Sequence, residues 1–297
     1  MKKKILNIDG GGVKVYLPLL LLNYIEKKTN KKIIDIFDFY AGVSASSIIL
    51  GGLLTDYSVE EMLIKFKDIS YNIFKIPYKY RISSVFGLFK SKYPDEGINV
   101  QLEKLYNNYK LSDVKKPLSI LTYDINSSLP VNYSSVKDNN NTLLWKVIRA
   151  SSSAPTYFTP FDIDNYTLLD GGMVVNNMCE YAFVNALEYY GNDTEFIQLS
   201  LGAGIFNKKY NKPHTLLDWI EIIINMKFNI TTIYENIMIT NLVKNSNQNS
   251  YHRFDFDLES EIRLDDYTAF DKMDKIFENW LENNKSQLDT IIELLIE

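Results

Sequence analysis

The residue whose setting most favours catalysis is Ser44, at the centre of a Gly-Val-Ser-Ala-Ser run at residues 42–46. The apolar stretch from Phe37 to Val43 predicts a buried strand before it, and the small apolar residues from Ala45 to Leu54 predict a helix after it. A serine on a tight turn between a strand and a helix is the arrangement of a nucleophile elbow. The helix N-terminus behind Ser44 would favour developing negative charge. The competing interpretation is a helix N-cap made of small residues.

A second candidate is the Asp-Gly-Gly-Gly run at residues 9–12, which directly follows a short strand pattern from Lys4 to Ile8. Consecutive glycines allow a backbone path with positive φ, which turns several N–H groups toward one point. Such a nest can bind either a phosphate or a tetrahedral oxyanion. Gly10, Gly11 and Gly12 are therefore candidate donors to an anionic oxygen, with a plain tight turn as the competing interpretation.

A third candidate is Asp170, which ends an apolar stretch at residues 166–169 and is followed by Gly171 and Gly172. A carboxylate at the end of a strand, with glycine allowing close approach, suits a general base. An ordinary Asp-Gly turn is the more common meaning of this dipeptide. Because the nest, the serine and the carboxylate each follow a strand, a parallel sheet would place them together along its C-terminal edge.

The surrounding pattern predicts an α/β fold with three α/β/α layers around a mostly parallel sheet. Two strand–turn–helix units occur early in the chain, which is typical of a parallel sheet covered by helices. Further strands are expected at residues 118–123 and 195–201, a loop at 138–141, and helices at 16–28, 142–151, 178–190, 216–245 and 271–295. No Pro/Gly/Ser-rich linker interrupts the chain, so a single domain over residues 1–297 is expected.

Composition argues against several classes of protein. The formal net charge of −5 argues against a nucleic-acid surface, because phosphate binding needs clustered Lys and Arg. The single cysteine, Cys179, excludes an intrachain disulfide and a thiolate metal site, and it fits a reducing compartment. The longest apolar run, Val15 to Leu22, is far below the ~20 residues that span a bilayer. Asp9 interrupts the Lys-rich start, so no signal peptide is expected and the protein is predicted to be soluble and cytoplasmic.

Taken together, the three motifs resemble the patatin-like phospholipase family, whose pattern runs D-G-G-G-x-[RK]-G, then G-x-S-x-G, then D-G-[GA]. They stand here at Asp9–Val15, Gly42–Ser46 and Asp170–Gly172, and Lys14 occupies the family's Arg/Lys position. Connecting blocks at residues 150–160, 176–177 and 200–204 are similar to the family's A-S-S-A-A-P-x-Y-F, N-N-P and S-L-G-T-G segments. The resemblance is clearest over residues 4–204, whereas residues 213–297 are expected to be mainly helical and align poorly.

Three positions depart from the family pattern. Val15 replaces the last glycine of the first motif, Ser46 replaces the glycine that ends the elbow, and Met178 replaces the proline after the Asn-Asn pair. Val15 lies past the expected oxyanion donors, and Ser46 is still small, so neither is expected to abolish activity. Valine disfavours positive φ, so the loop would have to be reshaped if the family needs that conformation at Val15.

The resemblance implies a serine acyl hydrolase of the phospholipase A type that cleaves fatty-acyl esters of lipids without a metal or other cofactor. Ser44 would attack the ester carbonyl after giving its proton directly to Asp170, with no catalytic histidine. The N–H groups near Gly10, Gly11 and Gly12 would hold the oxyanion, and water would release the fatty acid. The expected partners are a lipid substrate and a transient, peripheral contact with a membrane, and no nucleic acid; the acyl acceptor is left open.

Three alternatives remain open from the sequence. An α/β-hydrolase would use a Ser-Asp-His triad, and His214 or His252 could supply the histidine. A phosphate-binding enzyme of the sugar-kinase and actin-like type also begins with a strand and an Asp-Gly-Gly turn. A storage or interaction protein could carry the same scaffold with little catalysis.

A further hypothesis concerns membrane contact. Residues 69–93 contain no Asp or Glu and alternate aromatic residues with five cations, Lys75, Lys79, Arg81, Lys90 and Lys92. Aromatic rings and long cations suit an interfacial segment, so this stretch could form a lid or lip over Ser44. The competing interpretation is that the aromatic residues belong to the core and the cations to a solvated face.

Overall fold

A computed structural model describes residues 2–76, 80, 91–137, 141–206, 212–213, 215–244 and 249–297. Several predicted features lie outside the described residues. They are most of the expected loop at 138–141, His214, and three cations of the aromatic and basic segment, Lys79, Arg81 and Lys90.

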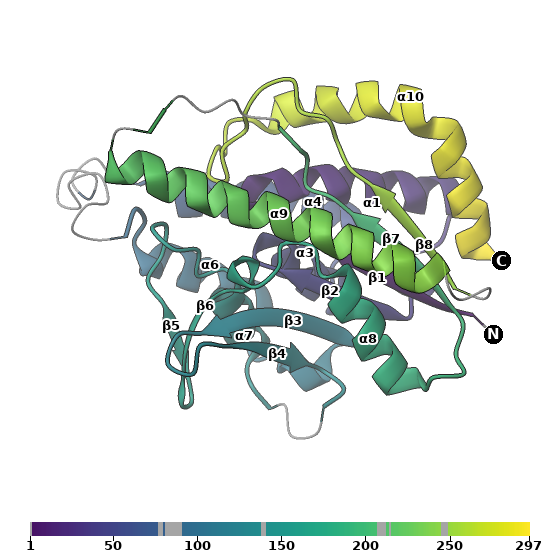
Figure 1. The fold of residues 1–297 in the computed structure, drawn as a ribbon, viewed down its shortest axis with the longest axis horizontal. Helices are drawn as coiled ribbons and strands as arrows, with labels where there is room; N and C mark the ends of the chain where they lie inside the picture. Colours follow the sequence, from purple (N-terminus) through teal and green to yellow (C-terminus); the bar gives the residue numbers. More distant parts are fainter. Residues whose placement is uncertain are drawn as a thin grey trace.

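The described strands form one sheet in the order β5-β6-β3-β2-β1-β7-β8, with β4 also paired to β3 (Figure 1). Their bounds are β1 Lys3–Ile8, β2 Phe39–Val43, β3 Leu118–Asp124, β4 Leu129–Ser134, β5 Phe161–Ile163, β6 Tyr166–Asp170, β7 Phe196–Leu201 and β8 Ser250–Phe254. The neighbouring strands β3, β2, β1, β7 and β8 pair in parallel. Strands β4, β5 and β6 pair in antiparallel fashion. The predicted α/β fold with a mostly parallel sheet is confirmed.

Helices cover both faces of this sheet. Their bounds are α1 Tyr16–Thr29, α2 Ile33–Ile36, α3 Ala45–Leu54, α4 Val59–Phe74, α6 Asp95–Tyr106, α7 Leu144–Ser151, α8 Cys179–Tyr190, α9 Leu216–Lys244 and α10 Phe270–Ile296, with short 3₁₀ helices η1 Gly12–Val15, η3 Leu111–Asp113 and η4 Gly171–Met173. Helices α8 and α9 lie over one face in Figure 1, and α1, α3, α4 and α10 belong to the layer on the other face. None of the described helices has the length and apolar character needed to cross a lipid bilayer.

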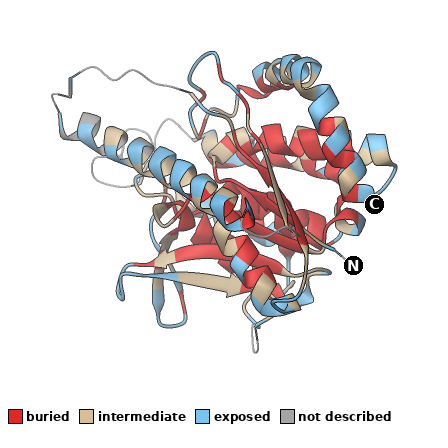
Figure 2. Cartoon of the chain, turned by 45° about the vertical axis from the view of Figure 1, so that its right-hand side comes forward, coloured by how far each residue is buried: buried red, intermediate tan, exposed pale blue. Residues whose placement is uncertain are grey.

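Alternating side chains of the central strands supply two separate cores. Leu6 and Tyr40 pack into the core shared with α1, α3 and α4, whereas Ile5 and Phe39 pack into the core shared with α8 and α9. Successive side chains of a strand point to opposite faces, so strands covered on both faces are apolar throughout. The red central strands in Figure 2 show this double burial.

Candidate active site

Ser44 stands on a strained turn between β2 and α3. Its backbone has φ 58° and ψ −135°, a conformation that L-residues rarely adopt and that is typical of a nucleophile elbow. The turn is held on one side by Ser151, whose Oγ accepts from the Ser44 N–H (2.9 Å) and donates to the carbonyl oxygen of Leu121 (2.7 Å). The strain is therefore supported by neighbouring elements, as expected at a functional position.

Ser46, the departure at the end of the elbow, has a structural role. Its Oγ lies 2.9 Å from the carbonyl oxygen of Ile8 and 2.8 Å from that of Val43, and it accepts from the Val43 N–H at 2.9 Å. The side chain is fully buried. Ser46 therefore ties the elbow to the end of β1, a contact that glycine could not make.

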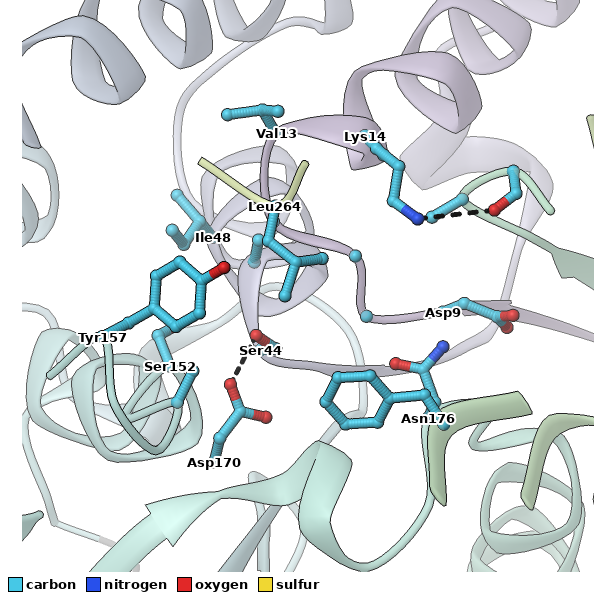
Figure 3. A pocket seen from close by; sticks show the side chains of 18 of the residues that line it. Asp9, Val13, Lys14, Ser44, Ile48, Ser152, Tyr157, Asp170, Asn176 and Leu264 are labelled. Atoms are coloured by element: carbon cyan, nitrogen blue, oxygen red, sulfur yellow. Dashed lines mark hydrogen bonds between the residues drawn. The ribbon is translucent and has the colours of Figure 1, made fainter. Parts of the chain in front are cut away.

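Asp170 reaches Ser44 because of the register of β3. On one edge of β3, Leu121 pairs with Val43 of β2, and the next residue, Thr122, pairs with Asp170 of β6. Strand β4 occupies the other edge over the same length, so β2 and β6 share this edge and meet end to end. The Ser44 Oγ–H donates to Asp170 Oδ2 at 2.6 Å, as Figure 3 shows.

The strand that carries Asp170 differs from the simple expectation. A parallel sheet was expected to bring the three motifs to one edge, but β6 runs antiparallel to β3. The carboxylate still arrives at the C-terminal end of β2, because β6 approaches from beyond that end. Gly171 follows with no room for a side chain, since an added Cβ would lie 2.1 Å from the carbonyl oxygen of Leu121.

Burial controls the acidity of Asp170. The side chain is 2% exposed, and loss of solvation raises its pKa from the ordinary 3.8 to about 6. Hydrogen bonds from the Ser44 hydroxyl and from the Gly172 N–H (2.7 Å to Oδ1) act in the opposite direction. The carboxylate is therefore more basic than a solvated aspartate, yet mostly ionised at neutral pH.

The glycine loop after β1 is closely packed against a distant segment. Gly12 has φ 58°, and a Cβ there would lie 2.1 Å from the carbonyl oxygen of Leu264, which accepts from the Val13 N–H at 2.9 Å. The Gly10 N–H donates to the carbonyl oxygen of Asn176 at 3.0 Å. For the N–H groups of Gly11 and Gly12, no acceptor occurs among the described residues.

Two other residues of the first motif have defined surroundings. Val15 has φ −63° and a fully buried side chain, so the loop does not require positive φ at this position. Lys14 lines the cavity beside the glycine loop, and its Nζ lies 3.5 Å from the carbonyl oxygen of Gly204. Burial lowers the pKa of Lys14, and the nearby carboxylates of Asp255 and Glu261 oppose that shift. Met178, the third departure, is a buried residue at the start of α8.

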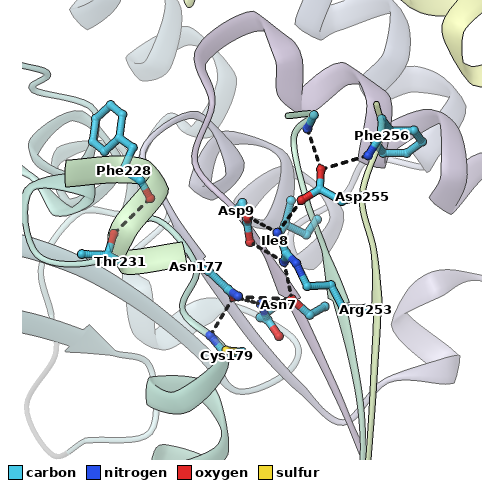
Figure 4. Close-up of polar contacts among 12 residues, drawn as sticks. Asn7, Ile8, Asp9, Asn177, Cys179, Phe228, Thr231, Arg253, Asp255 and Phe256 are labelled. Atoms are coloured by element: carbon cyan, nitrogen blue, oxygen red, sulfur yellow. Dashed lines mark hydrogen bonds and ion pairs between the residues drawn. The ribbon is translucent and has the colours of Figure 1, made fainter. Parts of the chain in front are cut away.

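Sequence analysis did not single out Arg253, which anchors Asp9 (Figure 4). The guanidinium of this β8 residue donates to both carboxylate oxygens of Asp9 (3.1 and 2.7 Å), to Asp255 (2.6 Å) and to Ser200 (2.9 Å). The two carboxylates raise the pKa of Arg253, so it keeps its charge despite burial. Asp255 in turn accepts from the Gly204 N–H at 2.9 Å. The network fixes the start of the glycine loop.

A cavity of about 280 Å³ opens beside Ser44 and Asp170. Its floor includes the glycine loop and Asn176, and most of the remaining lining is apolar. The apolar side chains come from α3, α4 and α9 and from the loop after α7; they include Ile48, Phe66, Ile69, Ile73, Phe74 and Phe158. The hydroxyl and the carboxylate therefore face an enclosed apolar space with a polar end.

The described histidine lies away from Ser44 and Asp170. His252 is on β8, which β7 and β1 separate from β2, and it does not line the cavity. Cys179 is fully buried. Within the described ranges, no group of three or more His, Cys, Asp or Glu side chains is placed to hold a metal ion.

The aromatic and basic segment is described only in part. Phe74 packs against Tyr93 and Phe158, so these rings belong to the interior. Lys92 pairs with Asp265, which also accepts from the Tyr93 hydroxyl at 2.6 Å. Lys75 is exposed, and Tyr71 is 45% exposed. The lid hypothesis depends on residues outside the described ranges and stays a hypothesis.

Comparison with known proteins gives a consistent family. The chain is 28% identical over 247 residues to the 85/88 kDa calcium-independent phospholipase A2 of Rattus norvegicus, covering 72% of this chain and 28% of that protein. It is 26% identical over 263 residues to patatin-like protein 2 of Arabidopsis thaliana, covering 73% of this chain and 65% of that protein. A probable inactive patatin-like protein 9 of Arabidopsis thaliana is 26% identical over 68% of this chain and 61% of that protein.

These relatives are longer than the chain, which spans between about a quarter and two thirds of their lengths. The family model described as patatin-like phospholipase matches residues 6–183, more than half of the chain and all three motifs. The chain belongs to the patatin-like phospholipase family.

Proposed function

We propose that this chain is a serine acyl hydrolase that cleaves fatty-acyl esters of phospholipids with Ser44 as nucleophile and Asp170 as general base. The observation that carries the proposal is the 2.6 Å hydrogen bond from Ser44 Oγ to the buried Asp170 carboxylate beside an apolar cavity. A hydroxyl alone is a weak nucleophile, and an adjacent base is what activates it.

In the proposed first step, Ser44 Oγ attacks the ester carbonyl carbon while its proton passes to Asp170 Oδ2. The carbonyl oxygen becomes an oxyanion, for which the N–H groups of Gly11 and Gly12 are the candidate donors. Gly10 was also expected to donate, but its N–H already bonds to Asn176. The proposal therefore narrows to two of the three glycines, in keeping with oxyanion holes built from backbone N–H groups.

The second half of the reaction reverses these proton movements. Protonated Asp170 gives its proton to the departing alcohol oxygen, and the C–O bond to the lysolipid breaks, which leaves an acyl group on Ser44 Oγ. Water then attacks this acyl-enzyme as Asp170 accepts its proton, and collapse returns that proton to Ser44 with release of the fatty acid. The raised pKa of about 6 suits a residue that alternates between base and acid at neutral pH.

The apolar lining supports a lipid as the substrate. Ile48, Ile69 and Phe74 offer a dry surface for an acyl chain, while the glycine loop lies at the polar end. Burial of an acyl chain stabilises the complex by about 0.8 kcal/mol per CH₂ group. A long-chain ester should therefore bind more tightly than a short one.

The test is a phospholipid panel with mass-spectrometric identification of products, run with Ser44→Ala, Asp170→Asn and the double variant. Each single change should lower kcat by about 10²–10⁴, and the double change should cost little more, because the two residues act as one unit. Wild type should also react with a fluorophosphonate probe at Ser44.

The alternatives give different results. A Ser-Asp-His triad requires that the His214→Gln/His252→Gln variant lose activity as Ser44→Ala does, whereas the dyad leaves that variant active. A storage or interaction protein would fail to react with the probe and would hydrolyse no ester. A phosphate-transfer enzyme would bind a nucleotide, and binding would be measured by calorimetry.

A further inference from the structure

The outer surface of α9 carries an unusual row of exposed apolar side chains. They recur at intervals of three and four residues, which keeps them on one side of the helix. The members of this row, called the α9 stripe, are Trp219, Ile223, Met226, Ile230, Ile233, Tyr234 and Ile237, and each is between 49% and 60% exposed. Figure 2 shows the pale blue outer side of the helix along most of its length. Contiguous exposed apolar surface of this kind marks an interaction site.

Between residues 222 and 243, the charged side chains of α9 point away from the stripe. Between residues 222 and 243 the sequence has only two charged side chains, Lys227 and Glu235. The Lys227 Nζ donates to the carbonyl oxygen of Val174 at 2.9 Å, and Glu235 is 5% exposed beside Glu180 of α8. An amphipathic surface helix normally buries its apolar side and exposes its charges. Along the stripe, helix α9 instead exposes apolar side chains, while Glu235 is buried.

The stripe is continuous with the cavity that holds Ser44. Phe228, Asn229, Thr232 and Ile233 of α9 all line that cavity. Ile233 is also 60% exposed, so one side chain belongs both to the cavity lining and to the stripe. Ile230 and Ile237 flank it on the outside of the helix. An apolar path therefore leads from the outer surface to the site.

We propose that the α9 stripe is the surface on which this protein docks onto a phospholipid bilayer, so that an acyl ester enters the cavity past Ile233. The proposal rests on the proposed function, because it takes the substrate to be a membrane lipid. The apolar stripe with its Trp and Tyr matches the boundary between headgroups and acyl chains, where aromatic side chains are enriched and apolar side chains can be buried. A second copy of the chain is a less suitable occupant of the stripe, because it would cover Ile233 and so block the apolar path into the cavity.

The neutral character of the stripe sets it apart from the basic segment at residues 69–93. Docking through cations would need anionic lipid and would weaken with salt. Docking through the stripe should occur on vesicles of phosphatidylcholine alone and should change little between low and high salt. The two modes are therefore separated by lipid composition and ionic strength.

The first experiment measures sedimentation with phosphatidylcholine vesicles in a Ser44→Ala background, so that no lipid is consumed. The stripe variant is Ile223→Gln/Ile230→Gln/Ile237→Gln. Glutamine is a good helix former, and none of the three positions lines the cavity. The control variant is Ile64→Gln/Val100→Gln/Val184→Gln, which alters three aliphatic residues on α4, α6 and α8 that are 63%, 50% and 51% exposed. The stripe variant should lose about a hundredfold in vesicle partitioning, roughly fivefold per isoleucine, and the control variant little.

Trp219 gives an independent readout. It is 52% exposed, whereas Trp145 and Trp280 pack against aromatic neighbours. Brominated phosphatidylcholine should quench the emission of the wild type, and Trp219→Phe should remove the quenched component. No quenching of Trp219, or unchanged vesicle binding by the stripe variant, would overturn the proposal. So would a concentration-dependent dimer that the stripe variant dissociates while vesicle binding stays the same.

Failure of the docking proposal is distinguishable from failure of the proposed function. With Ser44 intact, the stripe variant should hydrolyse a soluble short-chain ester within about twofold of the wild-type rate, since no residue of the site is changed. Hydrolysis without vesicle binding would retain the function and reject the docking surface. Vesicle binding without hydrolysis of any ester would reject the function and retain the surface.

Discussion

Replacing Asp170 by asparagine should stabilise the folded protein at neutral pH while removing most ester hydrolysis. The carboxyl is 2% exposed, and burial raises its pKa from 3.8 to about 6. Between these values the folded state binds more protons than the unfolded state, so the free energy of unfolding falls as the pH rises from about 4 to 6. A shift of about two pKa units corresponds to about 3 kcal/mol of lost stability at pH 7.

Asparagine is suited to this test because it can keep both hydrogen bonds. Its Oδ1 would accept from the Gly172 N–H, and its Nδ2 would donate to Ser44 Oγ, in place of the contacts that Asp170 makes at 2.7 and 2.6 Å. The variant should therefore exceed the wild type by up to about 3 kcal/mol above pH 6 and differ little from it near pH 4. The gain disappears at low pH because Asp170 is then neutral in the wild type as well.

Urea unfolding at pH values from 4 to 8 measures the difference, and hydrolysis of a soluble short-chain ester measures the activity. Asp124→Asn is the control of opposite sign, because the Ser127 hydrogen bond lowers the pKa of Asp124, and its replacement should destabilise the protein at neutral pH. An Asp170→Asn variant that is less stable than the wild type at pH 8, or a gain equal at pH 4 and pH 8, would refute the reasoning. The wild-type kcat/KM should rise with pH and level off above about pH 6.

Three further predictions follow from the site. Arg253→Met should cost about 3–5 kcal/mol in urea unfolding, because it would leave Asp9 as a buried carboxylate without its cation and would also remove the ion pair with Asp255. Arg253→Lys should cost less, and equal losses would argue against the ion pair. Gly12→Ala should lower both stability and hydrolysis, since a Cβ would meet the Leu264 carbonyl at 2.1 Å, and a folded, fully active variant would show that the loop can adjust. Chelation of divalent cations should leave the hydrolysis rate unchanged, and loss of activity that added metal restores would reject a metal-independent mechanism.

Local patterns predicted the elbow well. The helix after Ser44 was expected over residues 45–54, and α3 has these bounds. Strand β1 begins one residue earlier than predicted, and β2 begins two residues later because α2 precedes it. Strands β1 and β2 are mostly buried apolar runs that end directly at small-residue turns, and this local pattern is what identified them.

Other elements were missed although some signals were present. The helix α4 begins with a Ser58–Glu61 capping box, and α6 begins with Asp95 and Glu96 in its first turn; both are sequence signatures of a helix start. Strand β8 gave a weaker signal, because Tyr251, His252 and Arg253 are partly buried side chains on an edge strand and do not alternate with apolar residues. No such pattern distinguishes β8 from a loop.

The partner of Asp9 could not be predicted from local pattern at all. Arg253 lies 244 residues along the chain from Asp9, and only the pairing of β8 with β7 brings the two together. The antiparallel direction of β6 could not be predicted for the same reason, because the sequence pattern of a strand does not show which strand it pairs with or in which direction. The sequence motifs identified Ser44 and Asp170 as the proposed nucleophile and base, whereas sheet register determined whether the two side chains meet.

The geometry of the glycine loop depends on chain outside the family-matched residues 6–183. Arg253 fixes Asp9 before the loop, and the Leu264 carbonyl holds the Val13 N–H after it. Asp265 then ties this segment to Tyr93, whose ring stacks near Tyr157 of the cavity lining. If the N–H groups of Gly11 and Gly12 donate hydrogen bonds to the oxyanion, the direction in which these N–H groups point is set by contacts from residues 253–265. We therefore expect differences in that segment to change the rate of the proposed acyl transfer while Ser44, Asp170 and their motifs stay the same.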